Sequence, residues 1–379
     1  MVVDMDKKIE VSVICMTYNH EKYIAKALDT IISQRTDFNF EIVVHDDCST
    51  DSTADIIREY EKKYPDIVKP IYEKENQYSK GADVFMELTL PQARGRYIAV
   101  CEGDDYWLDD DKLQIQFNAM EKHPEVDMCA CGAMEMAESV ESLEIRPQLS
   151  DGILPVEDVI LGGGRYLATS SLFFRKELFD EFMEFEKVIC FDYSNQIKGA
   201  LRGGIYYVNR IMSVYRKAVE NSWTKRIERD KKKREEHINT EIAMLRQLDI
   251  DTNGRYKECI ERRITAYTPF YDQLQMHKDE ALEELSDCKE KIYLWGLGMR
   301  GDAIQEFCRN EHIMLDGVCD KQNAHIGENT VYDFKIVDTE YVLANSKVVL
   351  ASNHAIYDYL KKIGYEGLLI DFHKYMPLA

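Results

Sequence analysis

The sequence lacks the features of several protein classes. No apolar run in the 379-residue chain approaches the roughly 18–20 residues that a membrane-spanning helix needs. Residues 1–10 alternate in charge, without the apolar core and cleavage site of a secretion signal. Basic residues are outnumbered, and the formal net charge of −21 argues against the basic footprint that phosphate contacts with nucleic acid require. These absences predict a cytoplasmic protein that does not bind nucleic acid.

Paired metal-binding cysteines are also absent. The chain has ten cysteines but no CxxC motif, and apart from Cys129 and Cys131 they are widely separated. Several fall within apolar, strand-like segments, where cysteine usually behaves as a small buried hydrophobic residue. The cysteines therefore do not predict a structural zinc site.

One basic segment, residues 225–234, interrupts the acidic sequence. Acidic residues are interspersed in the long helical stretch around it, so we interpret it as a solvated helix face. The alternative is a contact with an anionic lipid surface or a phosphorylated acceptor, which would hold the protein at the inner face of a membrane.

Strand and helix patterns alternate in the first third of the chain. Short apolar segments predict strands, and helical spacing of apolar residues separates them. The expected strands cover residues 11–16, 40–44, 67–72 and 97–101, and the helices lie at 20–33, 52–60 and 84–93. This alternation predicts a mostly parallel sheet with helices on both faces. Further strands are expected near 127–134, 170–174 and 205–215, with a helix over 192–202.

The chain divides into three expected parts, all within the α/β class. Residues 1–220 hold the first α/β domain. Residues 221–289 are charged and helix-periodic, with one break at 251–254, and predict a helical connector. Residues 290–379 begin again with a strand, a turn and a helix, and predict a small second α/β domain.

Polar side chains follow three of the predicted strands. They are Thr17, Tyr18, Asn19, Asp46, Asp47, Glu102, Asp104 and Asp105. In parallel sheets ligands bind beyond the carboxyl ends of the strands, so we expect these side chains to converge on one rim.

The adjacent carboxylates Asp104 and Asp105 repel each other unless a cation or a hydrogen-bonding ligand compensates. Mg²⁺ and Mn²⁺ take oxygen ligands and often use one or two carboxylates together with substrate phosphates. The alternative is that both aspartates cap the helix that follows Asp109, and spacing alone leaves the two interpretations balanced. Asp46 and Asp47 have the same ambiguity, because capping residues follow them directly.

The motifs taken together resemble a known family. The segments VSVICMTYNHEKYIAKALDTIISQ, FEIVVHDDCSTDST and ARGRYIAVCEGDDYWLDDDKL are similar, in this order, to the N-terminal half of the family-2 glycosyltransferases. The resemblance runs from about residue 11 to 216, and FDYSNQIKGALRGGIYYVNRIMSVYRK looks like the family's acceptor-side segment. It implies the GT-A fold of a nucleotide-diphospho-sugar transferase.

The resemblance implies roles for the donor-binding residues. Thr17, Tyr18 and Asn19 match the motif that lines the nucleotide pocket, with Tyr18 stacking on the base. Asp47 matches the aspartate that hydrogen-bonds the base, commonly uracil. Arg216 falls in the family's Tyr-Arg motif, where the arginine helps to hold the diphosphate.

The same resemblance implies the catalytic and metal-binding residues. Asp104 and Asp105 match the metal and ribose–diphosphate motif, with Glu102 in the place of its earlier acid, and we expect Asp105 to bind Mn²⁺ or Mg²⁺ directly. Asp192 matches the general base, although an N-cap role in its helix is the alternative. Many relatives have a histidine where this chain has Ala218.

The implied reaction is an inverting transfer of a sugar from a nucleotide-diphosphate sugar, expected to be a UDP-sugar, to an acceptor hydroxyl. The acceptor expected from the resemblance is a glycan or lipid-linked intermediate of surface polysaccharide or glycolipid biosynthesis. Asn221, Ser222 and Trp223 are close enough in sequence to replace the missing histidine. The alternative function is a catalytically inactive protein that binds nucleotide-sugars or acts as a scaffold.

The second α/β domain carries a GxGxxG motif. Gly296, Gly298 and Gly301 lie between a predicted strand and helix, and Asp320 closes the next strand. The segment resembles the small Rossmann-like domains attached to some polysaccharide-biosynthesis enzymes. We interpret the glycines as allowing a tight turn and close packing, with a second nucleotide site as the alternative. An oxidoreductase is disfavoured, because no full-length dinucleotide domain is present.

Overall fold

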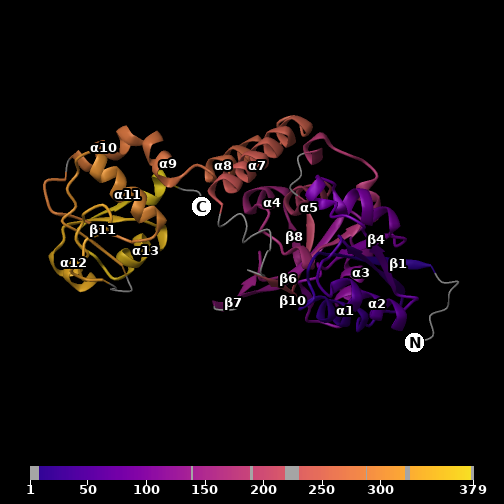
Figure 1. Ribbon diagram of the computed structural model, residues 1–379. Helices are drawn as coiled ribbons and strands as arrows, with labels where there is room; N and C mark the ends of the chain where they lie inside the picture. The colour runs from indigo at the N-terminus through magenta and orange to yellow at the C-terminus, as the bar shows by residue number, and fades with distance from the viewer. Residues whose placement is uncertain are drawn as a thin grey trace. The chain divides into compact units, whose positions relative to one another are not determined.

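The computed structural model describes residues 8–137, 140–187, 191–217, 230–286, 288–320 and 325–376. The chain forms two compact units, Met1–Ile260 and Glu261–Ala379. The division falls inside the segment expected to be a helical connector. Each unit contains a sheet with helices packed against it (Figure 1), so the α/β prediction is confirmed for both.

The sheet of the first unit begins with four parallel strands, which pair in the order β3-β2-β1-β4. They are β1 (Ile9–Thr17), β2 (Asn39–Asp46), β3 (Val68–Tyr72) and β4 (Tyr97–Val100). All four were expected from their apolar patterns. Because they run in the same direction, their carboxyl ends lie at one edge of the sheet.

Further strands extend this sheet beyond β4 in the order β4-β9-β6-β10-β5. Two more strands pair at its side, β7 with β6 and β8 with β10, and the complete sheet contains both parallel and antiparallel pairs. The added strands are β5 (Tyr106–Trp107), β6 (Met128–Ala137), β7 (Val140–Ile145), β8 (Gly152–Leu154), β9 (Phe173–Arg175) and β10 (Ile205–Arg216). Strands β10 and β5 are antiparallel, with Val214 opposite Tyr106. This pairing brings the end of β10 to the segment that follows β4.

One face of the parallel strands is covered by helices. Val11, Val13 and Cys15 alternate along β1 and pack in one apolar cluster with α1, α2 and α3. Helix α1 buries Ile24, Ala27, Leu28 and Ile31, the spacing of one helical face. The helices of this unit are α1 (Ile24–Ile32), α2 (Thr53–Lys63), α3 (Lys112–Lys122), α4 (Val156–Gly162), α5 (Phe191–Ala200), α7 (Lys231–Asp251) and α8 (Lys257–Ala266), which crosses into the second unit.

Short helical turns account for two differences from the sequence prediction. Residues 170–171, expected in a strand, belong to η4, where the Ser171 hydroxyl donates to the Ala168 carbonyl. The helix expected over 84–93 is a π-helical turn followed by a 3₁₀ turn that contains a proline. The short turns are η1 (Tyr78–Lys80), η2 (Val84–Thr89), η3 (Leu90–Gln92), η4 (Thr169–Ser171), η5 (Lys176–Phe179) and η6 (Glu184–Lys187).

Cysteines of the described segments are free, and most are buried. Cys15, Cys101, Cys129 and Cys131 are at most 1% exposed, which confirms their interpretation as small hydrophobic core residues. Cys190 lies outside the described residues.

The second unit is a parallel sheet in the order β12-β11-β13-β14, with apolar clusters on both faces. Its strands are β11 (Ile292–Trp295), β12 (Gly317–Cys319), β13 (Val348–Ala351) and β14 (Leu368–Asp371). Its helices are α9 (Phe270–Met276), α10 (Lys278–Ser286), α11 (Met299–Asn310), α12 (Thr339–Asn345), α13 (His354–Lys362) and the turn η7 (Phe372–Tyr375).

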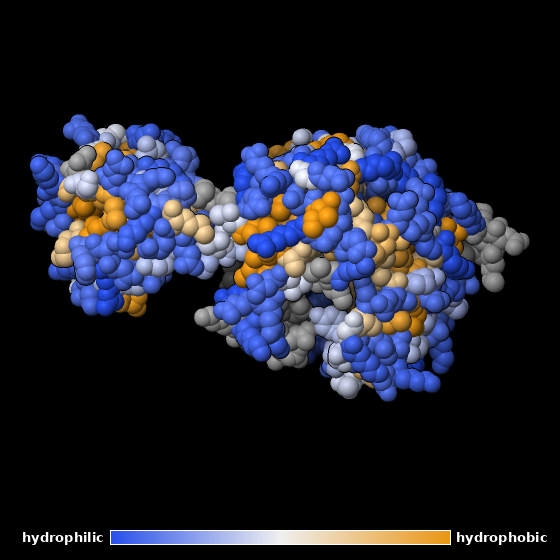
Figure 2. Space-filling view, turned by 90° about the horizontal axis from the view of Figure 1, so that it is seen from above, coloured by the Kyte–Doolittle hydropathy of each residue, from blue (hydrophilic) through white to orange (hydrophobic). Residues whose placement is uncertain are grey.

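The surface is largely polar in the view of Figure 2, where hydrophobic residues appear as separate patches. Within the described segments, no helix combines the length and the apolar character required to cross a bilayer.

The three glycines of the GxGxxG motif differ in how much space the fold leaves for a side chain. Gly296 has φ +115°, and a Cβ there would lie 1.9 Å from Ser352 Oγ. A Cβ on Gly301 would lie 1.9 Å from the Gly296 carbonyl oxygen, whereas a Cβ on Gly298 would meet nothing within 4 Å. Gly296 and Gly301 are therefore required by the turn after β11 and by the packing of α11 against it.

We expect Gly301→Ala to lower the free energy of unfolding of the second unit by roughly 1–3 kcal/mol, the usual range for overpacking. The backbone clash outweighs the helix propensity gained with alanine. Gly298→Ala is the matched control: its Cβ meets nothing, and the poorer N-cap of α11 should cost only about 0.5–1 kcal/mol, less than Gly301→Ala. Urea unfolding of the full chain, followed by pulsed amide hydrogen exchange of the peptides that cover β11 and α11, measures both. Equal midpoints for the two variants would contradict the assigned packing role.

Candidate functional site

The polar clusters that follow β1, β2 and β4 lie together at the carboxyl edge of the first sheet. The Gly103 amide donates to the Met16 carbonyl at 2.9 Å, and the Asp47 amide donates to the Thr17 carbonyl at 3.0 Å. The Asn19 side chain accepts from the Thr50 amide at 2.7 Å. The predicted convergence on one rim is thus present in the structure.

A close approach at Gly103 holds the first and third clusters together. A Cβ on Gly103 would lie 2.6 Å from Thr17 Oγ1 and 2.9 Å from His20 Nδ1. Only glycine lets the loop after β4 pass this close to the loop after β1.

Asp105 is the most enclosed acid of the site, with 1% of its surface exposed. Its Oδ1 accepts a hydrogen bond from the Arg216 amide at 2.9 Å, while its Oδ2 is buried without a hydrogen-bond partner among the described residues. Burial, and then the charge of Asp104, raise the pKa of Asp105 well above its usual range. Contacts with Arg216 and with the Ser170 side chain oppose this rise in the pKa of Asp105 only in part.

Asp104 lies next to it, with its carboxylate partly open to solvent. Its Oδ2 is 3.8 Å from His20 Nε2, and its carbonyl oxygen accepts from the Arg216 guanidinium. The amide of Arg216 therefore binds Asp105, and its guanidinium binds Asp104. Arg216 reaches both because β10, which it ends, pairs with β5, which directly follows the two aspartates.

The Arg216 guanidinium is also held by aromatic rings. Its Cζ lies 5.1 Å from the centre of the Tyr23 ring and 4.5 Å from that of Tyr106. Contacts of this kind fix the position of a cation without neutralising it. The positive charge of Arg216 remains available to an anion at the rim.

Asp192 joins the acidic group from helix α5. The charge of Asp192 is the largest cause after burial of the raised pKa of Glu102, and the charges of Asp104 and Asp105 follow. Thr169 Oγ1 donates to Asp192 Oδ1 at 2.8 Å. Desolvation raises the pKa of Asp192, and the bond from Thr169 opposes that rise.

The structure decides against the capping alternatives for these aspartates. Asp192 lies inside the first turn of α5 and its carboxylate accepts from Thr169, so it is not an N-cap. The N-cap position of α3 is Asp111, seven residues after Asp104 and six after Asp105. The first amide of α2 is bonded by Asp51 rather than by Asp46 or Asp47.

Asp47 reaches the rim, but its carboxylate already has backbone partners. Oδ1 accepts from the Gln77 amide at 2.7 Å, and Oδ2 accepts from the Tyr78 amide at 3.1 Å. Asp47 thereby ties the segment around η1 to the end of β2. Each carboxylate oxygen keeps a second lone pair for a further donor.

The remaining nucleotide-pocket residues lie at the same rim. Tyr18 is 43% exposed, and Thr17 Oγ1 is buried without a hydrogen-bond partner in the described parts of the chain. Asn19 has a left-handed backbone, φ 56°. An exposed ring beside polar groups without partners is suited to stacking on a planar ligand.

Several residues of the site were not predicted from the sequence. They are His20, Tyr23, Tyr106 and Thr169, which contact Asp104, Arg216 or Asp192. Only His20 had a signal, because it directly follows the polar cluster of β1.

Some sequence predictions lie outside the described residues. Ala218 and its proposed substitutes Asn221, Ser222 and Trp223 are among them, as is the first half of the basic segment, residues 225–229. The described end of that segment begins helix α7, where Asp230 accepts from two amides of the first turn.

The donor set fits a hard divalent cation. Four carboxylates, those of Glu102, Asp104, Asp105 and Asp192, influence one another's charge. Arg216 and His20 are the basic groups that contact this set. An enclosed carboxylate oxygen without a partner and a neighbouring open one are the ligands that Mg²⁺ or Mn²⁺ binds.

Comparisons with known proteins agree with this geometry. The sequence profile described as "Glycosyl transferase family 2" matches residues 12–181. An uncharacterized protein of Mycobacterium tuberculosis is 33% identical over 213 residues, 56% of this chain and 60% of that protein. The Bacillus subtilis protein named putative teichuronic acid biosynthesis glycosyltransferase TuaG is 38% identical over 110 residues, 29% of this chain and 41% of TuaG. The chain thus spans about 60% of the length of the first curated relatives it matches.

Among solved structures, that of S. aureus TarS 1-349 in complex with UDP-GlcNAc has a TM-score of 0.52 and 17% identity, covering 79% of this chain and 81% of that one. At this identity the likeness concerns the fold, and it confirms the predicted GT-A fold. With the profile match, the motifs at the rim and the fold in agreement, residues 12–181 belong to glycosyl transferase family 2.

Proposed function

We propose that this protein transfers a sugar from a nucleotide-diphosphate sugar to an acceptor hydroxyl, with inversion at the anomeric carbon, and that it depends on a divalent metal ion. The observation that carries the proposal is the acidic group around Asp105, whose enclosed Oδ2 has no partner among the described residues. Buried like charges are costly to a fold, and a bound cation and ligand account for them.

Asp104 and Asp105 are the residues proposed to hold Mn²⁺ or Mg²⁺. When bound, such an ion neutralises part of the negative charge of the diphosphate and stabilises the charge that develops on the leaving group. Asp105 presents a fixed oxygen because the Arg216 amide orients its carboxylate. The guanidinium of Arg216, held between Tyr23 and Tyr106, is placed to attract the same diphosphate.

Asp192 is the proposed general base. Its raised pKa makes it a better proton acceptor than an ordinary aspartate, and its bond from Thr169 fixes one oxygen. The second carboxylate oxygen would take the proton of the acceptor hydroxyl as that hydroxyl attacks the anomeric carbon. Holding both reactants at one rim lowers the barrier further.

The proposed nucleotide is UDP. Tyr18 offers an exposed ring for the base, and Asp47 retains lone pairs for a base N–H. UDP-GlcNAc is bound in the TarS structure of the same fold, and an Escherichia coli relative, 38% identical over 111 residues, is named as a UDP-Glc glucosyltransferase. The names of that relative and of TuaG place both in glycan assembly, so the proposed acceptor is a surface glycan or a lipid-linked intermediate.

Asp105→Asn should abolish the rise in melting temperature that UDP with Mn²⁺ produces in the unmodified protein. The amide keeps an oxygen for the Arg216 N–H but loses the charge that binds the cation. Without ligands the variant should melt at an equal or higher temperature, because one of four repelling carboxylates is gone. Thermal-shift measurements with UDP, GDP and MnCl₂ test this, with the exposed Asp66→Asn as control. A full UDP–Mn²⁺ shift in Asp105→Asn would contradict the metal assignment.

Asp192→Asn should lower sugar transfer, or hydrolysis of the donor, by at least about 100-fold, the usual scale for loss of a general base. UDP release from UDP-sugars measures turnover, and UDP–Mn²⁺ binding should stay within a few-fold of the unmodified protein. Asp180→Asn, an exposed aspartate, is the matched control. If the unmodified protein binds UDP with Mn²⁺ but turns over no UDP-sugar, the alternative of an inactive binding or scaffold protein gains support instead.

A further inference from the structure

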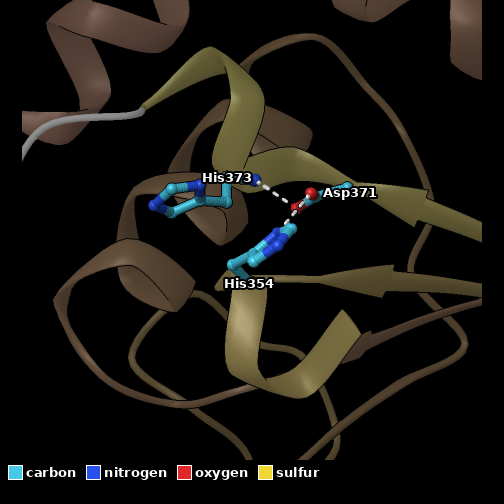
Figure 3. A group of neighbouring side chains, drawn as sticks. All are labelled: His354, Asp371 and His373. Carbon is cyan, nitrogen blue, oxygen red and sulfur yellow. Dashed lines mark hydrogen bonds and ion pairs between the residues drawn. The ribbon is translucent and has the colours of Figure 1, made fainter. Parts of the chain in front are cut away.

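Two histidines and an aspartate meet at the carboxyl edge of the second sheet, a site that the proposed transfer reaction does not use. His354 is the first residue of α13, after β13, and Asp371 is the last residue of the neighbouring strand β14. His373 follows in η7. Ala351 and Asp371 are paired in the β13–β14 register, which brings these chain segments side by side (Figure 3).

The donor atoms of these three side chains all lie within 4.8 Å of one another. His354 Nδ1 is 3.2 Å from Asp371 Oδ2. Two ligands at about 2.1 Å from a zinc ion, separated by an angle of about 100°, lie about 3.2 Å apart. The His354–Asp371 distance is therefore that of two ligands on one ion, as well as that of a hydrogen bond.

A second carboxylate faces the other nitrogen of His354. Asp358 Oδ2, one helical turn further along α13, lies 3.6 Å from His354 Nε2. Metal-bound histidines usually donate their free ring N–H to a carboxylate, which fixes the tautomer and the ring orientation. Asp358 is placed to do this while Nδ1 faces Asp371.

His373 is tied to the same aspartate through its backbone. Its amide donates to Asp371 Oδ1 at 3.1 Å, and in Figure 3 its ring points away from the carboxylate. A rotation of this side chain is needed to bring its nitrogen onto a shared ion.

The nearby basic groups have other contacts. The Arg300 guanidinium lies 4.7 Å from the centre of the Phe270 ring, and Lys361 Nζ lies 4.4 Å from that of Tyr357. Arg300 also donates from Nε to the Met376 carbonyl at 3.4 Å. These contacts hold both cations on aromatic rings rather than on Asp371.

A simple ion pair between His354 and Asp371 explains one contact of the group. It does not account for the second histidine beside the same carboxylate, nor for the second carboxylate on the opposite side of the His354 ring. Two imidazoles and one carboxylate are ligands that suit zinc and similar divalent transition metals better than Mg²⁺.

We propose that His354, Asp371 and His373 form a binding site for a divalent transition-metal ion of the zinc type. Three protein ligands leave at least one coordination position for an exogenous group. His354 is 61% exposed, so that position opens to solvent. The three ligands belong to the second unit, whereas the acidic centre belongs to the first.

The test is a titration of the full, chelator-treated chain with Zn²⁺ by calorimetry, in an Asp105→Asn background that removes the proposed metal ligand of the first unit. The His354→Asn and His373→Asn variants should each weaken Zn²⁺ binding by at least about tenfold, since even second-shell changes cost 10–100-fold. His325→Asn is the matched control: His325 is exposed in the same unit and has φ 61°, which asparagine tolerates. It should bind Zn²⁺ like the parent.

Co²⁺ in place of Zn²⁺ gives an independent reading through its visible absorption. The parent and His325→Asn should show the same Co²⁺ spectrum, and His354→Asn should lose it at unchanged metal-free melting temperature. Equal Zn²⁺ affinity and stoichiometry in His354→Asn, His373→Asn and His325→Asn would overturn the proposal. So would the absence of Zn²⁺ and Co²⁺ binding in the parent, an outcome that does not depend on the folding of the histidine variants.

Discussion

The repulsion among enclosed carboxylates at the carboxyl edge of the first sheet is the constraint on which the rest of this unit depends. Asp105 is 1% exposed and has one oxygen without a partner among the described residues. Such an arrangement costs folding free energy, and Arg216 offsets part of it through its amide and guanidinium. The long strand β10 and its pairing with β5 bring Arg216 there. The fold thus tolerates a charge excess that a cation and a nucleotide would relieve.

Much of this rim followed from the sequence, because its positions are local. Strands β1, β2 and β4 are short apolar runs, and polar residues come directly after them. The contacts that complete the site are not local: Thr169 reaches Asp192 and Arg216 reaches Asp105 across large sequence separations. Spacing could not decide between caps and ligands for Asp104 and Asp105, and the observed N-cap of α3, Asp111, excludes the capping role. Likewise, no pattern indicated that Asp47 would bind the amides of Gln77 and Tyr78.

The second unit repeats the same architectural rule with different chemistry. Its parallel strands also place polar groups at their carboxyl edge, here Asp371 at the end of β14 and one histidine in each of the segments that follow β13 and β14. The fold itself requires two of its three motif glycines, Gly296 and Gly301, as expected of a tight turn and close packing. Asp320 accepts from the Leu297 amide at 3.0 Å and so supports that turn. The histidines carried no sequence signal, since 19 positions separate His354 from His373.

The central claim is that the acidic centre binds a divalent cation and a nucleoside diphosphate together. Calorimetric titration of the full chain with UDP, with and without saturating Mn²⁺, tests it most directly. Binding through a shared site couples the two ligands, and each then tightens the other by the same factor. The account predicts that Mn²⁺ lowers the Kd for UDP by at least about tenfold, which is about 1.4 kcal/mol of coupling. An equal UDP affinity in the presence and absence of Mn²⁺, or no UDP binding in either, would contradict it.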